Sequence, residues 1–314
     1  MSSQSTRVVG AALIGNLLVA ATKFAAAAIT GSSAMTSEAV HSLVDSGNEV
    51  LLFYGLRRAA RPPDADHPFG HGRELYFWSF IVAVAIFSLG ACASVYEGVR
   101  HIQSPVPIRN PVVNYVVLGL ALVFEGGSWR VAFEQFRAVK GGMGYWEAVR
   151  TSKDPTTFTV LAEDTAAILG ILIAFAGTVA AGALGRPVLD GLASIAIGVL
   201  LGLVAVVLAR ETKGLLIGEP ARSELVSSIC AMARAMPGID RSNGLFTVHI
   251  GPREVVAALS VDFDDTLSAG EVERIVAELE DRVRKAHPEV VSLLVKPQKW
   301  EHADFTQLRQ EEDN

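Results

Sequence analysis

Residues 165–184 read TAAILGILIAFAGTVAAGAL and contain no charged side chain. Two further stretches, residues 75–96 and 191–209, are equally free of charge. A helix needs about 20 apolar residues to cross a hydrocarbon core about 30 Å thick. The three stretches therefore predict membrane-spanning helices, and they decide the fold: the chain is expected to be an integral membrane protein.

The composition of the whole chain agrees with that interpretation. Of its 314 residues, 50% are hydrophobic and only 19% are charged, and the mean hydropathy is +0.36. A soluble protein of this length needs more charge to cover its surface. Cys92 and Cys230 lie in a predicted span and a distant polar segment, so they indicate no disulfide framework. The net charge of −6 provides no basic surface, and no nucleic acid partner is expected.

Working outward from the three stretches, the hydropathy pattern predicts six spans, at residues 8–29, 33–56, 75–99, 112–133, 157–181 and 188–209. The second is the least apolar and is recognised by its neighbours. Basic residues gather in the loops after the second and fourth spans, which by the positive-inside rule places both termini in the cytoplasm. These residues are Arg57, Arg58, Arg61 and Arg73, then Arg137, Lys140, Arg150 and Lys153. The polar start, residues 1–10, has no cleavage pattern, so it leads into a retained first span.

From residue 214 onward the composition is that of a small soluble domain. The pattern predicts a helix at 223–236, strands at 245–250 and 255–263, a helix from Ser268 to about residue 286, and a strand at 290–295. The order α-β-β-α-β predicts an antiparallel sheet with helices on one face. The predicted domains are 1–213 in the membrane and 214–300 in the cytoplasm, with an acidic tail at 301–314 that is expected to be disordered.

The second span carries four ionisable residues in one narrow sector of the helix: Glu38, His41, Asp45 and Glu49. Such groups are costly inside a membrane and usually mark function. His41 and Asp45 are four residues apart, so both can reach one ion. Imidazole nitrogen with carboxylate oxygen suits Zn²⁺, and also Fe²⁺, Co²⁺ or Mn²⁺. The alternative is a polar seam packed between helices.

Two further groups could bind a cation. Glu163 and Asp164 begin the fifth span, where they need a cation, a partner or protons; the alternative is an acidic cap at a helix N-terminus. The loop after the second span reads DADHPFGHG at residues 64–72. Asp64, His67 and His71 could hold a second metal ion there, or form only a polar turn.

Read together, these segments resemble the cation diffusion facilitators. The resemblance rests on HSLVD at residues 41–45 and HPFGHG at 67–72, and it covers nearly the whole chain. Segments SKDPTT at 152–157, LAEDTAA at 161–167 and VDFD at 261–264 are similar to the branch that includes the animal mitochondrial zinc transporter. The family implies six spans, a ferredoxin-like cytoplasmic domain, and a homodimer that exchanges a cytoplasmic divalent metal for protons.

The resemblance also implies a set of site residues. The transport site would use His41 and Asp45 from the second span, and Asp164 and position 160 from the fifth. Position 160 is Val160 here, which cannot bind metal, so Glu163 or a water is expected to take its place. The auxiliary loop site would be formed by Asp64, His67 and His71.

The cytoplasmic domain departs further from the family pattern. Strands 259–264 and 292–297 lack the expected histidines, and His249 and His287 are interpreted as surface or packing residues. We expect a dimerisation domain with a weak metal site or none.

The expected function is export of a divalent metal, with Zn²⁺ favoured over Fe²⁺, Mn²⁺ and Co²⁺, in exchange for protons. No permanently bound cofactor is expected. A membrane metalloenzyme is disfavoured because the chain has no His-Glu-x-x-His motif and no nucleophile beside a base. A non-transporting scaffold or regulator stays open, because Val160 breaks the site pattern. The absence of an Arg- and Ser-rich transit peptide favours a bacterial plasma membrane.

Overall fold

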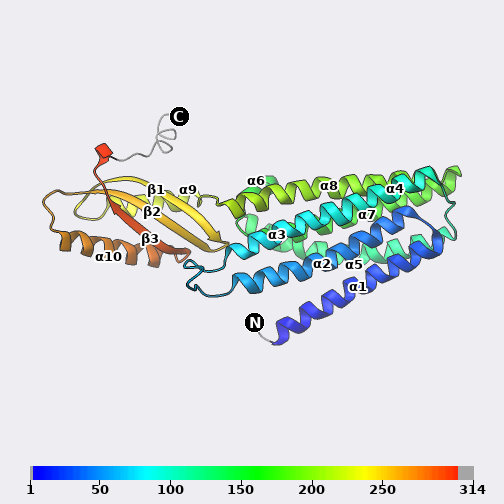
Figure 1. The fold of residues 1–314 in the computed structure, drawn as a ribbon, viewed down its shortest axis with the longest axis horizontal. Helices are drawn as coiled ribbons and strands as arrows, with labels where there is room; N and C mark the ends of the chain where they lie inside the picture. Colours follow the sequence, from blue (N-terminus) through cyan, green and yellow to red (C-terminus); the bar gives the residue numbers. More distant parts are fainter. Residues whose placement is uncertain (1–2, 303–314) are drawn as a thin grey trace. The chain divides into compact units, whose positions relative to one another are not determined.

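The computed structural model describes residues 3–302, and its contacts divide the chain into two compact units (Figure 1). The first unit consists of Met1–Arg58 and Glu74–Lys213. The second consists of Ala59–Arg73 and Gly214–Asn314. The segment with the loop histidines therefore groups with the C-terminal part of the chain. Of the predicted acidic tail, residues 303–314 lie outside the described part.

The first unit is helical. Its elements are α1 (Ser3–Thr30), α2 (Ser33–Ala59), α3 (Arg73–Ala85), a π-helical segment (Ile86–Ala91), α4 (Cys92–Gln103), α5 (Pro111–Lys140), α6 (Tyr145–Thr151), α7 (Pro155–Leu184) and α8 (Val188–Ile217). The segment from α3 through α4 forms one continuous helix, Arg73–Gln103.

Four helices of the described residues are long and apolar enough to cross a membrane: Arg73–Gln103, α5, α7 and α8. They confirm the third to sixth predicted spans. In α1 the residues whose side chains are described include the shorter apolar segment Asn16–Thr30. Helix α2 has the length, but its ionisable residues lower its hydropathy. The first two predicted spans are thus helices whose membrane crossing stays a prediction.

Helix α7 begins and ends where local chemistry dictates. Asp154 is the N-cap, and its carboxylate accepts a hydrogen bond from the Thr156 backbone N–H at 3.0 Å. Pro155 occupies the first turn, where its missing N–H leaves no bond unmade. Gly185 ends the helix with a φ of 61°, which glycine adopts without strain.

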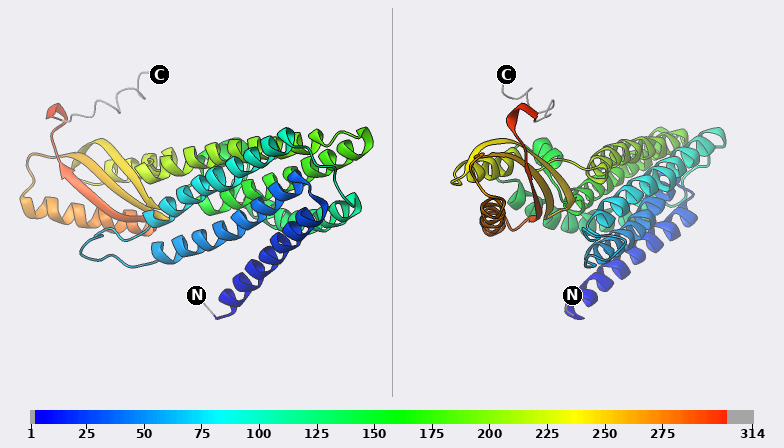
Figure 2. Two further views of the ribbon diagram at one scale, coloured as in Figure 1. Left: turned by 45° about the vertical axis from the view of Figure 1, so that its right-hand side comes forward. Right: turned by 60° about the vertical axis from the view of Figure 1, so that its left-hand side comes forward.

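Both α2 and α5 pack antiparallel to α7. For α5, Ser128 lies opposite Asp164, and the Tyr115 ring lies 5.3 Å from the Phe175 ring. For α2, Asn48 lies opposite Glu163, while Glu38 reaches Gly170, where a Cβ would collide with its carboxylate. Since both helices run against α7, they run parallel to each other (Figures 1 and 2).

The start of α2 is held by a side chain from α8. Asp190 is fully buried, and its carboxylate accepts bonds from the Ser33 N–H at 2.5 Å, the Ala34 N–H at 3.3 Å and the Ser32 hydroxyl at 2.8 Å. The first N–H groups of a helix have no partner within the helix, and a carboxylate is favourable at that end. Asp190 therefore caps α2 from another helix.

The second unit contains α9 (Ser223–Arg234), β1 (Ile239–Gly251), β2 (Glu254–Phe263), α10 (Ala269–Ala286), β3 (Val290–Pro297) and a 3₁₀ turn (Trp300–His302). The element order α-β-β-α-β is the predicted one. Strands β1 and β2 pair antiparallel, but β2 and β3 pair parallel. The predicted wholly antiparallel sheet is therefore wrong. The chain crosses over through α10 between these strands and so returns in the same direction.

Both helices of this unit cover one face of the sheet, as the pattern predicted. Ile229 of α9 and Leu279 of α10 are fully buried in one core with Leu259 of β2. The predicted start of α10 is also present: the Ser268 N–H donates to the Glu271 carboxylate at 2.8 Å, and the Ser268 hydroxyl accepts from the Glu271 N–H.

Candidate metal centre

His41 and Asp45 lie one turn apart on α2, in the interior of the helical unit. The His41 Nδ1 atom is 3.2 Å from Asp45 Oδ1, and His41 is 1% exposed. Neither ring nitrogen of His41, nor Oδ1 of Asp45, has a hydrogen-bond partner among the described residues. Buried polar atoms are normally paired. The two side chains therefore present a nitrogen and an oxygen that are free to bind a ligand.

Glu163 and Asp164 diverge from α7 toward two different helices. Glu163 is buried and accepts a 2.6 Å bond from the Asn48 amide of α2. Asp164 accepts a 2.9 Å bond from the Ser128 hydroxyl of α5. Both carboxylates interact electrostatically with Asp45. They lie two turns inside a helix capped by Asp154, so neither is the acidic cap that was the alternative.

The four predicted transport-site residues lie in the same part of the helical unit, but their ligand atoms are not close enough together to surround one metal ion. Within residues 3–302, they do not bring three ligand atoms within 4.8 Å of one another. Each α7 carboxylate instead bonds a neutral polar side chain of a neighbouring helix. Binding of one ion by all four would require these side chains to turn inward.

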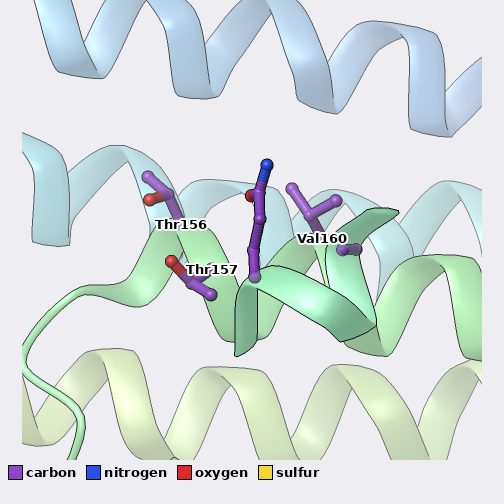
Figure 3. A pocket seen from close by; sticks show the side chains of 5 residues that line it. Thr156, Thr157 and Val160 are labelled. Atoms are coloured by element: carbon purple, nitrogen blue, oxygen red, sulfur yellow. The ribbon is translucent and has the colours of Figure 1, made fainter. Parts of the chain in front are cut away.

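Val160 faces a small pocket between α5 and α7 (Figure 3). The pocket has a volume of about 150 Å³ and is lined by Ala132 and Gln135 of α5 and by Thr156, Thr157 and Val160 of α7. Val160 lies one turn before Asp164. A ligand at position 160 would therefore have pointed toward α5, whereas the valine offers no donor atom there.

Two ionisable residues of the membrane unit were missed from the sequence. Lys23 of α1 is fully buried and pairs with Glu38 at 3.0 Å, and it also donates to the Ser42 hydroxyl at 2.8 Å. Glu125 of α5 interacts electrostatically with Asp45. The signal for both in the sequence is a charged residue inside an apolar span.

The loop residues converge closely. Ligand atoms of Asp64, His67 and His71 all lie within 4.8 Å of one another. Asp64 contacts both histidines. Its Oδ2 atom lies 2.9 Å from His71 Nε2, and its Oδ1 atom accepts a hydrogen bond of 2.7 Å from the His67 backbone N–H. The hydrogen bond with His71 and that N–H lower the pKa of Asp64 to about 2. An ionised carboxylate beside two imidazoles is a donor set that suits Zn²⁺.

The two remaining histidines of the C-terminal unit have packing partners. His249 is buried in β1, with Nδ1 3.3 Å from the Gly251 carbonyl. His287 ends α10, with Nε2 2.8 Å from the Ser228 hydroxyl. Both contacts fit the interpretation of these histidines as packing residues.

Comparison with known proteins gives a consistent result. The family model for the cation efflux transmembrane domain matches residues 9–217, well over half of the chain. Metal tolerance protein C4 of Arabidopsis thaliana is 35% identical over 262 residues, which is 83% of this chain and 57% of that protein. The human mitochondrial proton-coupled zinc antiporter SLC30A9 is 35% identical over 260 residues, 82% of this chain and 46% of that one.

More distant matches cover other parts of the chain. The cation-efflux pump FieF of Escherichia fergusonii is 22% identical over 82% of this chain and 81% of its own. A solved nickel form of MamM CTD matches 25% of this chain and all of its own at 16% identity, with a TM-score of 0.23. The chain spans about half the length of the plant and human relatives. From the matched transmembrane domain and these relatives, the chain belongs to the cation diffusion facilitator family, close to the SLC30A9 branch.

Proposed function

We propose that the protein moves a divalent metal cation out of the cytoplasm in exchange for protons, with Zn²⁺ as the preferred cargo over Fe²⁺, Mn²⁺ and Co²⁺. The observation that carries the proposal is the His41–Asp45 pair, whose nitrogen and oxygen atoms are buried without hydrogen-bond partners. The family supports it, as do two of the relatives, a zinc antiporter and a metal tolerance protein.

The exchange follows from the chemistry of the donors. Metal binding requires a neutral imidazole at His41 and ionised carboxylates at Asp45 and Asp164, so protons and metal compete for the same atoms. Imidazole exchanges its proton near neutral pH. With the site open to the cytoplasm the metal binds, and with the site open to the other side protons displace it. Glu163 would complete the site directly or through a water.

The apolar surroundings make the exchange obligatory. Uncompensated carboxylates inside a membrane unit are costly, so either the metal or protons must neutralise them. An empty, fully ionised site is therefore the least favourable state. The carrier would change its orientation with one or the other bound, which couples the two fluxes.

The remaining features of the proposal concern the setting. Asp64, His67 and His71 form an auxiliary site at the cytoplasmic entrance, where their loop is placed by the flanking arginines. The protein works as a homodimer with both termini in the cytoplasm, in a bacterial plasma membrane.

The test is metal uptake into sealed vesicles. The purified chain is reconstituted in liposomes with an imposed pH gradient, and Zn²⁺ entry and proton exit are recorded together. We expect Zn²⁺ entry to depend on the gradient and to stop when a protonophore collapses it. Gradient-independent entry would contradict proton exchange. No entry, with the protein folded and inserted, would favour the scaffold or regulator that Val160 leaves open.

A further inference from the structure

Glu125 lies inside the apolar helix α5 without any evident structural task. It is half-buried, and it makes no hydrogen bond or ion pair with any residue whose side chain the structure describes. The neighbouring Ser128, one turn away, donates to Asp164. An ionisable group within a membrane-spanning helix is costly and is usually retained for a function.

Helix register places Glu125 at the depth of Asp45. On α5, Ser128 lies opposite Asp164 of α7, and Glu125 is one turn before Ser128. On α2, Asn48 lies opposite Glu163 of α7, and Asp45 is nearly one turn before Asn48. Helices α2 and α5 run parallel to each other and antiparallel to α7. Moving back three residues on either helix, from Asn48 to Asp45 or from Ser128 to Glu125, therefore advances about 4.5 Å toward the C-terminal end of α7.

The α7 side chains at the depth of Asp45 and Glu125 are small and leave room for the Glu125 side chain. Ala166 and Ala167 of α7 are the buried residues at this depth, and both are small. Glu125 interacts electrostatically with Lys23 most strongly and then with Asp45, His41 and Glu38, and Asp164 interacts with Glu125 in turn. Glu125 is thus a neighbour of the transport site from a third helix.

A separate observation indicates that this site takes a ligand. His41 is buried and its Nε2 has no hydrogen-bond partner, while its Nδ1 lies 3.2 Å from Asp45 Oδ1 without forming a hydrogen bond. Helix α7 supplies one ligand fewer than the family pattern because position 160 is valine. Glu163 is less suited to that place, since its Oε1 is bonded to Asn48 in the direction of α2.

We infer that Glu125 supplies the fourth metal ligand of the transport site from α5, in place of residue 160. This inference rests on the proposed function. The resulting set of one imidazole and three carboxylates, His41, Asp45, Asp164 and Glu125, draws on three helices rather than two. This set contains more oxygen ligands than a site with two histidines, so it should bind harder divalent ions better than such a site does.

The test uses Co²⁺ alone, whose visible absorption reports ligand binding directly. The full chain carries His67→Ala and His71→Ala so that the loop does not contribute to the spectrum. Glu125→Gln is compared with Glu134→Gln, an exposed glutamate of the same helix that pairs with Arg130. We expect Glu125→Gln to weaken Co²⁺ binding by at least about tenfold and to change the band shape, while Glu134→Gln does neither. Equal Co²⁺ affinity in the two variants overturns the inference.

Two further variants separate a ligand from a structural role. If Glu125→Gln does not fold, as judged by elution and thermal unfolding, Glu125→Asp is titrated instead, and a spectrum and affinity equal to those of Glu134→Gln overturn the inference. Val160→Asp is then added to Glu125→Gln, to return a carboxylate to α7. Recovery of Co²⁺ affinity supports the inference, and failure to recover overturns it.

Vesicle uptake keeps the inference apart from the proposed function. If the unmodified chain binds Co²⁺ through Glu125 but transports no metal, the proposed function fails and the ligand assignment stands. If the unmodified chain transports and Glu125→Gln transports as fast as Glu134→Gln, the ligand assignment fails and the function stands.

Discussion

Lys23 of α1 and Glu38 of α2 form an ion pair 3.0 Å long whose two side chains are both fully buried. Lys23 also donates to Ser42, and the second oxygen of Glu38 has no hydrogen-bond partner among the described residues. The pair lies one turn from His41. It fixes α1 against the helix that carries the proposed site.

Replacing only one partner of the Lys23–Glu38 ion pair should destabilise the helical unit. Lys23→Met leaves a buried carboxylate without its partner, which costs roughly 3–5 kcal/mol. Thermal unfolding in detergent should show a clear loss. The double variant Lys23→Met with Glu38→Gln should recover most of it, because no lone charge remains. A single variant as stable as the unmodified chain would show that the charges are compensated in another way.

Replacing Asp45 should remove transport without unfolding the protein. Asp45→Ala deletes the carboxylate beside His41 and leaves the two ring nitrogens without a second donor. We expect gradient-driven Zn²⁺ uptake to fall to that of protein-free vesicles, with unchanged elution on size exclusion. Normal uptake by this variant would mean that the ion binds elsewhere.

The loop histidines should affect affinity more than rate. His67→Ala with His71→Ala removes two of the three converging ligands. An auxiliary site at the entrance raises the local metal concentration, so we expect the apparent affinity for Zn²⁺ to fall by about tenfold while the maximal rate is largely kept. Complete loss of uptake by a folded variant would make this site central instead.

Asp64 should titrate abnormally because of its bond to His71. That bond and the His67 N–H lower its pKa from 3.8 to about 2. A lowered pKa in the folded state stabilises the loop above the usual pKa, and the stabilisation is lost as pH falls from 3.8 toward 2. In His71→Ala the pKa should move back toward 3.8, as measured by NMR on labelled aspartate. An unchanged pKa would show that the backbone N–H alone holds it down.

The departure at position 160 predicts altered selectivity. Val160→His adds a nitrogen ligand on the side facing α5 and should sharpen the preference for Zn²⁺ over Mn²⁺ in competitive uptake. Asp164→Asn should impair transport more than Glu163→Gln, because Asp164 occupies the aspartate position that the family uses as a ligand. Wild-type uptake by Glu163→Gln would leave water or Glu125 as the fourth ligand. Equal loss in both variants would place both carboxylates on the ion.

Local patterns predicted much of the fold. The fifth span was expected at residues 157–181 from its apolar length, and it forms as Pro155–Leu184. The serine cap of α10 was likewise predicted from local sequence. The direction of β3 was not, since it depends on how the crossover packs on the sheet rather than on the strand's own residues.

The site was predicted only where its residues share one helix. His41 and Asp45 share one helix, so their spacing alone brings them together. The bonds of Glu163 to Asn48 and of Asp164 to Ser128 join different helices and follow from packing. Glu125 stands out in the sequence only as a charged residue in an apolar span, and its place near His41 and Asp45 depends on how α5 packs.

Because Asp190 caps α2, the N-terminal end of that helix is fixed and the helix can move only by tilting about this end. A tilt of α2 that keeps the bonds to Ser33 and Ala34 must pivot at residue 33. At a rise of 1.5 Å per residue, His41 lies about 12 Å from the pivot and Glu49 about 24 Å. A tilt of about 10° would carry them about 2 Å and 4 Å. The helix can thus open the end nearer Glu49 widely while the half near Ser33 stays almost still.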